Sequence, residues 1–191
     1  MKTATSILRS EHEAILKMLD ATEETARRAE AGQSVSPATL AGLLEFFKVF
    51  ADQCHHGKEE QLLFPLLERK GLPRQGGPLG VMLHEHDQGR ELIREMSVAT
   101  ASHATGDPAA ASRWAAAARA YSYLLRSHIA KENDVLFVMA ERLLADNEQA
   151  GLANDFDRLE VERMGAGTHE RLHASMKVLL DEIFPQVGGV R

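Results

Sequence analysis

The sequence predicts an all-α protein, an antiparallel up-down-up-down four-helix bundle followed by a C-terminal helical extension. Aromatic residues make up only 5% of the chain, while Ala, Leu, Glu and Arg are plentiful, which favours helices over a large sheet. Four long segments carry apolar residues at helical spacing. Short loops containing Gly and Pro separate these segments, and short connections join antiparallel neighbours in bundles.

The first two helices are predicted at residues 5–31 and 37–69. The apolar positions of the first helix are Ile7, Leu8, Ile15, Met18, Leu19 and Ala26. Gly32 ends this helix, because glycine readily takes the conformation that follows a helix C-terminus. Ser36 and Pro37 then begin the second helix, as an N-cap followed by proline at the first helical position.

Proline also marks the later helices of the bundle. Pro65 predicts a kink or an early end near Phe64, because proline removes a backbone donor from the helix interior. A third helix is predicted at about residues 78–103. Asp107 and Pro108 repeat the cap-then-proline signal and open a long, Ala-rich fourth helix to about residue 144.

Beyond the bundle, the sequence predicts a loop at about 146–152, a short acidic helix at about 153–163 and a last helix at about 168–183. The chain of 191 residues is within the size of one domain. We therefore expect a single domain over residues 1–191, with a bundle at 5–145 and an extension at 146–191 packed on its end or side.

The overall charge excludes some classes of partner. The formal net charge is −6 and the sequence pI is about 5.8, so we expect neither nucleic acid nor a membrane surface as a partner. The longest clean apolar run, residues 135–140, is too short to span a bilayer, and the N-terminus has no apolar signal-peptide core. Cys54 is the only cysteine, which fits a reducing compartment, so a cytoplasmic location is expected.

Nine histidines are unusual for this length, and several follow an internal repeat. His12 follows Glu11 in the first helix, and His86 follows Glu85 in the third. His55 with Glu59, and His128 with Glu132, occupy corresponding places in the second and fourth helices. The period is about 74 residues. The repeat predicts a pseudo-twofold bundle in which equivalent residues meet near the axis.

Helix geometry gives this repeat a chemical meaning. Residues four apart lie on one face of a helix, so each His-x3-Glu pair offers an imidazole and a carboxylate inward. His12 and His86 add one imidazole each from the facing helices. Six such ligands exceed the needs of one ion and suit two, with the carboxylates between them. Imidazole with carboxylate suits iron, manganese or zinc rather than calcium or magnesium.

The local sequences HHGKEEQLLFP, GPLGVMLHEHDQGREL and HIAKENDVLF resemble the motifs of the hemerythrin-like (HHE cation-binding) family over about residues 5–145. The resemblance implies a hemerythrin-like bundle with a non-heme di-iron centre, two iron ions joined by an oxo or hydroxo bridge. The ligands that it implies are His12, His55, Glu59, His86, His128 and Glu132.

Two features depart from the oxygen-carrying members of that family. Those proteins have a His-x3-His pair on the third helix, whereas Arg90 stands four residues after His86 here. They also have an aspartate five residues after the last ligand histidine, where this chain has Glu132 four residues after His128. A missing fifth histidine would leave one iron more open, which favours redox or peroxide reactivity over reversible oxygen carriage.

The sequence therefore indicates a metal protein that binds, senses or reduces a small oxidant such as O2, peroxide or nitric oxide. Family resemblance leaves three alternatives open: an enzyme, an iron sensor or reservoir that acts through a separate and unknown protein partner, and a zinc-filled structural bundle. Iron–sulfur repair is a further role within the family. Residue patterns do not choose among these functions.

Several polar residues near the six implied ligands are not interpreted as metal ligands. The repeat places Ile129 opposite His56, so His56 is interpreted as a surface or supporting residue, and His84 likewise. Glu11 and Glu85 are interpreted as exposed charges, with a role in orienting the imidazoles as the alternative. Four further residues are candidates for an accessory or supporting role at the metal site: Tyr121, Glu162, His169 and His173.

Overall fold

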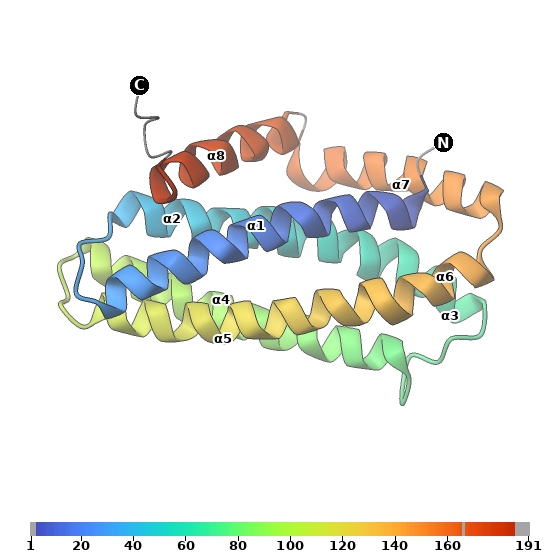
Figure 1. Cartoon of the computed structure of the whole chain (residues 1–191). Helices are drawn as coiled ribbons and strands as arrows, with labels where there is room; N and C mark the ends of the chain where they lie inside the picture. Colours follow the sequence, from blue (N-terminus) through green and yellow to red (C-terminus); the bar gives the residue numbers. More distant parts are fainter. Residues whose placement is uncertain (1–2, 166, 186–191) are drawn as a thin grey trace, which may run out of the picture.

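The computed structural model describes residues 3–165 and 167–185, apart from the side chains of Met164 and His169. It confirms the all-α bundle, since no strand occurs among the described residues. Among the described residues, the elements form four helical rods followed by the helices α7 and α8. The rods run antiparallel, and α7 and α8 lie along one side of the bundle (Figure 1). The first rod is α1, Ala4–Glu30, which begins at the N-cap Thr3 and ends before Gly32, whose φ is +68°.

The second rod changes its helical form along its length. It runs without a break through α2 (Pro37–Phe46), the π-helical segments η1 (Phe47–His56) and η2 (Glu59–Leu63), and α3 (Phe64–Arg69). Of the two alternatives predicted near Phe64, a kink or an early end, the early end is therefore wrong. Pro65 falls in the first turn of α3, where the backbone bonding returns from i→i+5 to i→i+4 and a missing N–H is tolerated.

The third and fourth rods repeat this arrangement. The third rod is α4, Pro78–Ala104. The fourth consists of α5 (Ala110–Lys131), the π-helical segment η3 (Glu132–Leu136) and α6 (Phe137–Leu143). Both π-helical regions lie where the two His-x3-Glu pairs occur, and π-helical turns are often found at functional sites.

The C-terminal extension contains α7 (Asp146–Met164) and α8 (Thr168–Ile183). The predicted loop at 146–152 is wrong, because α7 begins at Asp146. Asp146 and Glu148 place negative charge in its first turn, and the Glu148 carboxylate accepts a hydrogen bond of 3.0 Å from the backbone N–H of Ala145. The helix accommodates Gly151, which faces solvent.

The extension packs on the side of the bundle. Figure 1 shows α7 and α8 along α1, with α8 beside α2, and α7 also contacts η1 and η2. α8 approaches α2 closely at Gly42, where a Cβ atom would lie only 3.1 Å from a Leu179 methyl group. The extension therefore contributes side chains to the buried core of the domain.

Two apolar clusters fill the interior, one toward each end of the bundle. The first cluster includes Ile15, Phe47, Ile93, Trp114 and, from α8, Leu172, Leu179 and Ile183. The second includes Leu8, Phe64, Met82, Phe137 and, from α7, Leu152 and Phe156. On every rod, the predicted metal ligands lie in the chain between residues of these two clusters. The polar site is thus held between two apolar layers, away from water.

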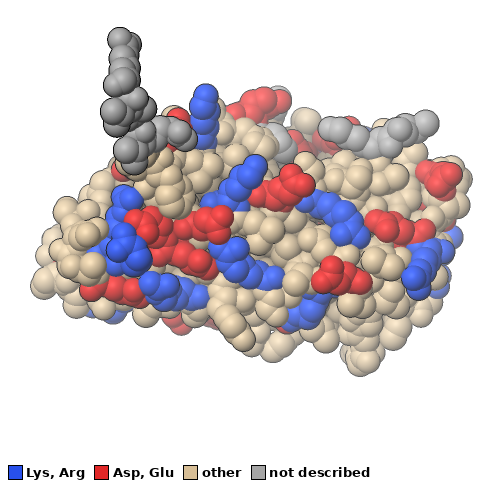
Figure 2. All heavy atoms as spheres, viewed as in Figure 1, with Lys and Arg blue, Asp and Glu red and all other residues tan. Residues whose placement is uncertain are grey.

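The outer surface mixes charges of both signs. Figure 2 shows Lys and Arg interspersed with Asp and Glu on the face that it presents. Arg119 binds Glu30 and Arg126 binds Glu23, which joins α5 to α1 by exposed ion pairs. Within the described part of the chain, no helix combines the length and the apolar character needed to cross a membrane.

Candidate metal centre

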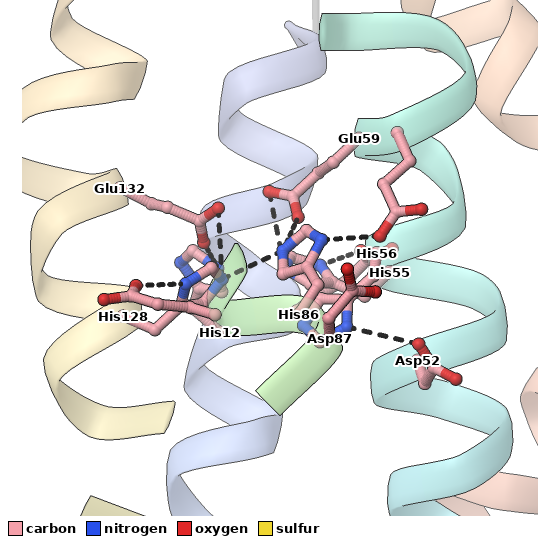
Figure 3. A network of polar contacts seen from close by, with 12 residues as sticks. His12, Asp52, His55, His56, Glu59, His86, Asp87, His128 and Glu132 are labelled. Carbon is pink, nitrogen blue, oxygen red and sulfur yellow. Dashed lines mark hydrogen bonds and ion pairs between the residues drawn. The ribbon is translucent and has the colours of Figure 1, made fainter. Parts of the chain in front are cut away.

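The structure brings the six predicted ligands together in the middle of the bundle. His12 comes from α1, His55 from η1, Glu59 from η2, His86 from α4, His128 from α5 and Glu132 from η3. All six are at most 1% exposed, and their polar atoms point toward one another (Figure 3). The repeat therefore placed the equivalent residues of the two halves correctly near one axis.

The polar atoms form two adjoining groups, each able to hold a cation. Cluster A comprises His12, His55, Glu59 and Glu132, and cluster B comprises His56, Glu59, His86 and His128. Within each cluster, one ligand atom from every residue lies within 4.8 Å of the others. Burial of every member makes each cluster a closed polar site in an apolar interior.

Both carboxylates lie between the two clusters. Glu59 directs Oε1 toward His55 Nε2 at 3.7 Å and Oε2 toward His86 Nε2 at 3.5 Å. Glu132 directs Oε2 toward His12 Nε2 at 3.1 Å and Oε1 toward His128 Nε2 at 3.3 Å. Each carboxylate therefore presents one oxygen to a histidine of each cluster, the arrangement expected of carboxylates that bridge two metal ions.

The unpaired atoms of these residues test whether a cation fits. The buried Nε2 atoms of His12, His55 and His56, and both carboxylate oxygens of Glu59 and Glu132, have no hydrogen-bond partner. Unpaired polar atoms are costly in a protein interior, and a cation bound among these seven atoms would offset that cost. Imidazole nitrogen with carboxylate oxygen is a donor set for iron, manganese or zinc.

Burial keeps most of the imidazoles neutral, as metal binding requires. It lowers the pKa of His55 to about 4 and those of His56 and His86 to about 3. At His128, burial is outweighed by Glu132 and then Glu85, which raise its pKa to about 9. Without a cation, burial and the nearby Glu132 carboxylate raise the pKa of Glu59 well above its usual range. Positive charge placed between the carboxylates removes this repulsion.

The outward nitrogen of His55 and of His128 is held by a glutamate. His55 Nδ1 donates to Glu11 Oε2 at 2.8 Å, and His128 Nδ1 donates to Glu85 Oε2 at 3.0 Å. The interpretation of both glutamates as exposed charges is therefore wrong: Glu11 is buried and the Glu85 side chain is 12% exposed. Each precedes one ligand histidine in sequence but points from its helix toward the ligand histidine of the next rod. The Glu-His dipeptide that occurs in both repeats is the sequence feature that could have predicted this supporting role.

Two other repeat-equivalent residues hold the remaining histidines. His86 Nδ1 donates to Glu60 Oε1 at 2.7 Å, and His12 Nδ1 lies 3.0 Å from Asn133 Oδ1. All four histidines that the repeat predicts are thus anchored at Nδ1 and aim Nε2 inward. Such outer hydrogen bonds fix the ring orientation and raise the donor strength of the metal-facing nitrogen.

His56 is the main residue that the sequence analysis missed. It is 3% exposed, not a surface residue, and its ring stacks on that of His86 at a centroid distance of 3.9 Å. The physical reason is the π-helical form of η1, in which consecutive side chains are rotated by less than the roughly 100° of an α-helix. His55 and His56 therefore both face inward, and cluster B contains three imidazoles to the two of cluster A.

Arg90 stands where the oxygen carriers would have a fifth histidine, and it lies outside both clusters. Its guanidinium donates to Asp52 Oδ1 at 2.8 Å and to Glu60 Oε1 at 2.6 Å. Asp52 in turn lies 3.5 Å from His56 Nδ1, and Glu60 accepts from His86. The second rod nevertheless brings a fifth imidazole, that of His56, into cluster B.

None of the accessory candidates whose side chains are described belongs to cluster A or cluster B. Tyr121 is fully buried, packs edge-on against Phe47 at 4.9 Å, and belongs to the first apolar cluster. Glu162 is exposed on α7, and the exposed position expected for His84 is confirmed. His173 packs edge-on against Phe50 at 5.6 Å. The side chain of His169 lies outside the described residues. Neither cluster contains any of these described side chains.

Comparison with known proteins agrees with this geometry. The family model described as the hemerythrin HHE cation binding domain matches residues 3–140. Relatives named iron-sulfur cluster repair protein YtfE occur in Escherichia coli O1:K1 / APEC, in Escherichia coli O139:H28 (strain E24377A / ETEC) and in Shigella boydii serotype 18 (strain CDC 3083-94 / BS512). Each is 34% identical over 121 residues, which is 60% of this chain and 54% of the relative.

The chain thus spans about half the length of the curated relatives it matches. No solved structure matches it. The family match includes every rod of the bundle and all members of clusters A and B. This protein belongs to the hemerythrin HHE cation-binding domain family, and its buried histidines and glutamates form a site for metal ions.

Proposed function

We propose that the protein holds two iron ions, one in each cluster, and reacts with a small oxidant such as O2, peroxide or nitric oxide. The observation that carries the proposal is the position of Glu59 and Glu132, each with one oxygen toward a histidine of either cluster. One ion does not satisfy two such carboxylates and five inward imidazoles. A pair of iron ions held there supplies redox chemistry toward the oxidant.

The residues of the two clusters contribute unequally to such a reaction. Cluster B offers three imidazoles, and cluster A offers two. Cluster A therefore offers one nitrogen donor fewer than cluster B, and we infer that a small external ligand binds on its side. The anchored Nδ1 atoms keep every ring oriented, so little reorganisation is required when a ligand enters. The apolar clusters on both sides exclude bulk water from the site.

Metal content is the first test. Protein loaded with iron is expected to carry two ions per chain and to show near-ultraviolet absorption in its ferric form. Metal analysis with an optical spectrum measures both. One tightly held ion after iron loading contradicts the two-metal proposal, and a colourless protein filled with zinc under iron-replete conditions supports a structural role instead.

Metal removal is expected to lower the melting temperature without unfolding the helices. A ligand present at about a thousand times its Kd stabilises the folded state by about 4 kcal/mol. For a chain of this size that corresponds to roughly 8–16 °C. The apolar clusters remain, so the circular dichroism of the helices persists at low temperature. An unchanged melting curve after verified metal removal contradicts the proposed site.

Turnover distinguishes the roles that remain. Steady consumption of hydrogen peroxide or nitric oxide by iron-loaded protein supports an enzyme, whereas a reversible spectral change without consumption supports a sensor that acts through a separate protein partner. If protein that holds two iron ions shows neither consumption nor a spectral change, the proposed reaction with these oxidants is contradicted.

Iron supply for iron–sulfur cluster repair is a second candidate function. Its support is the 34% identity to relatives named as iron-sulfur cluster repair proteins, over a matched segment of 121 residues. This function predicts that iron leaves the loaded protein and restores activity to an iron–sulfur enzyme whose clusters have been damaged. If the damaged enzyme recovers equally well with the metal-free protein and free iron, this candidate is excluded.

A further inference from the structure

The two halves of the bundle contain equivalent chains of contacts that lead outward from the metal site. In the first half, His55 donates to Glu11, which also binds the Lys58 ammonium. In the second half, His128 donates to Glu85, which binds the Lys131 ammonium. Lys58 and Lys131 each stand three residues after the ligand histidine, so the internal repeat includes these lysines.

Their surroundings differ, however. The Lys58 side chain is 2% exposed, whereas that of Lys131 is 39% exposed. Lys58 Nζ also donates to Glu160 Oε2 of α7 at 2.9 Å, and the Cys54 thiol lies 3.8 Å from the same oxygen. The C-terminal extension therefore supplies a second carboxylate to Lys58 and shields its ammonium from solvent.

Glu11, Cys54 and Glu160 by themselves form a set that could hold a metal ion. The positive charge at this place is the Lys58 ammonium, which binds both carboxylates. A buried ammonium requires partners on more than one side, because it has three protons to donate and no water nearby. Glu160 supplies the partner that Glu11 alone does not.

This arrangement links α7 to one metal position. With Glu160 in place, Lys58 is held between two carboxylates, and the orientation of Glu11 is determined by its two bonds to Lys58 and His55. Without Glu160, the Lys58 ammonium lacks one acceptor and draws in water or shifts, and Glu11 moves with it. His55 belongs to cluster A only, so the effect reaches one of the two clusters.

We propose that Glu160 is a positioning residue for cluster A: acting through Lys58 and Glu11, it fixes the His55 imidazole and slows loss of the metal ion held there. Among the described residues, no second carboxylate holds Lys131 in the same way beside cluster B. This inference rests on the two-metal function proposed above. It gives the C-terminal extension a role in retaining one particular ion.

The test compares the iron-loaded full chain with its Glu160→Gln and Glu160→Asp variants. Asp157→Asn is the matched control, because Asp157 is an exposed acid on the same helix and its replacement removes the same charge. Release of iron to an excess of a ferrous chelator is followed by absorbance, and the melting temperature of each metal-free protein is measured separately. A His56→Ala background, in which cluster B has lost an imidazole, identifies the ion that responds.

We expect Glu160→Gln to release one of two ions roughly tenfold to a hundredfold faster than the unmodified chain, the range known for residues that support metal ligands. Release of the other ion and both measurements on the Asp157→Asn control remain unchanged, whereas the metal-free melting temperature of Glu160→Gln falls because Lys58 loses one charged partner. Glu160→Asp, which keeps the charge, restores part of the retention. In the His56→Ala background, Glu160→Gln accelerates release of the ion that remains.

Three results overturn the inference: unchanged release of both ions, equal acceleration of both, or a lower metal-free melting temperature with no change in release. If the unmodified chain holds fewer than two ions, the proposed two-metal function fails, and the inference that rests on it fails as well. Two ions in every variant with identical release rates leave the two-metal function standing and refute the role of Glu160 alone.

Discussion

Replacing Glu59 with leucine is expected to abolish binding of both metal ions while leaving the metal-free protein folded. Glu59 presents one oxygen to His55 of cluster A and the other to His86 of cluster B, so one substitution damages both positions. Both oxygens lack hydrogen-bond partners, so the carboxylate contributes little to the metal-free fold. Leucine has a similar size and removes a carboxylate that burial and the neighbouring Glu132 destabilise in its charged form, so the metal-free fold is not expected to lose stability.

Metal analysis after iron loading measures the loss of the two ions, and thermal unfolding of the metal-free variant measures whether the fold keeps its stability. A protein that still binds two ions shows that Glu59 is not a shared ligand. A metal-free protein with a much lower melting temperature indicates that Glu59 supports the fold instead.

His56→Ala is the matched comparison for Glu59→Leu. His56 belongs only to cluster B, so this variant is expected to keep the ion of cluster A and to lose or weaken the ion of cluster B. The loss of affinity at cluster B should be at least the roughly tenfold to hundredfold seen for residues that only support ligands. Two ions bound with unchanged affinity would show that His56 does not bind metal.

Replacing Lys58 with methionine is expected to destabilise the protein by about 3–5 kcal/mol, the usual cost of breaking a buried ion pair by removing one partner. Glu11 is buried, and Lys58 neutralises both it and Glu160. Burial alone would raise the pKa of Glu11, but the hydrogen bond from His55 and the charge of Lys58 hold it below its usual value. Methionine removes that charge and leaves two carboxylates facing one another.

Lys131→Met is the control, because the repeat makes Lys131 equivalent to Lys58 while its side chain is 39% exposed. Exposed ion pairs contribute about 0–1 kcal/mol, so this variant should unfold nearly like the original chain. Thermal unfolding of the metal-free proteins should therefore separate the two variants by roughly 4–20 °C for a chain of this size. Similar melting temperatures for both variants would show that α7 does not enclose the Lys58 charge.

Predictions of helices that rest on local sequence patterns agree with the structure. Apolar residues at helical spacing and proline after a capping residue are local signals, and they predicted four rods and the last helix. The loop predicted at 146–152 is instead helical, and Gly151, a residue type that usually marks loops, lies inside the exposed helix α7. The first-turn acids Asp146 and Glu148 were the better guide there.

At the candidate site, the sequence by itself determined which residues of the two halves correspond, because a repeat and an i,i+4 spacing are visible without coordinates. Those two facts placed His55 with Glu59 and His128 with Glu132 at the centre of the bundle. Tertiary structure alone decided that His56 also faces inward, since the π-helical turn of η1 is not marked by residue type.

Tertiary structure also decided which charges are buried. Glu11 and Glu85 both precede a ligand histidine and both bind a lysine. The Glu11–Lys58 pair is buried beneath α7, whereas the Lys131 side chain of the Glu85–Lys131 pair is 39% exposed. Whether an acid is exposed depends on which element packs over it, and that is a property of three-dimensional neighbours. The sequence determined the inward ligands and their symmetry, whereas packing of the extension made the two halves unequal.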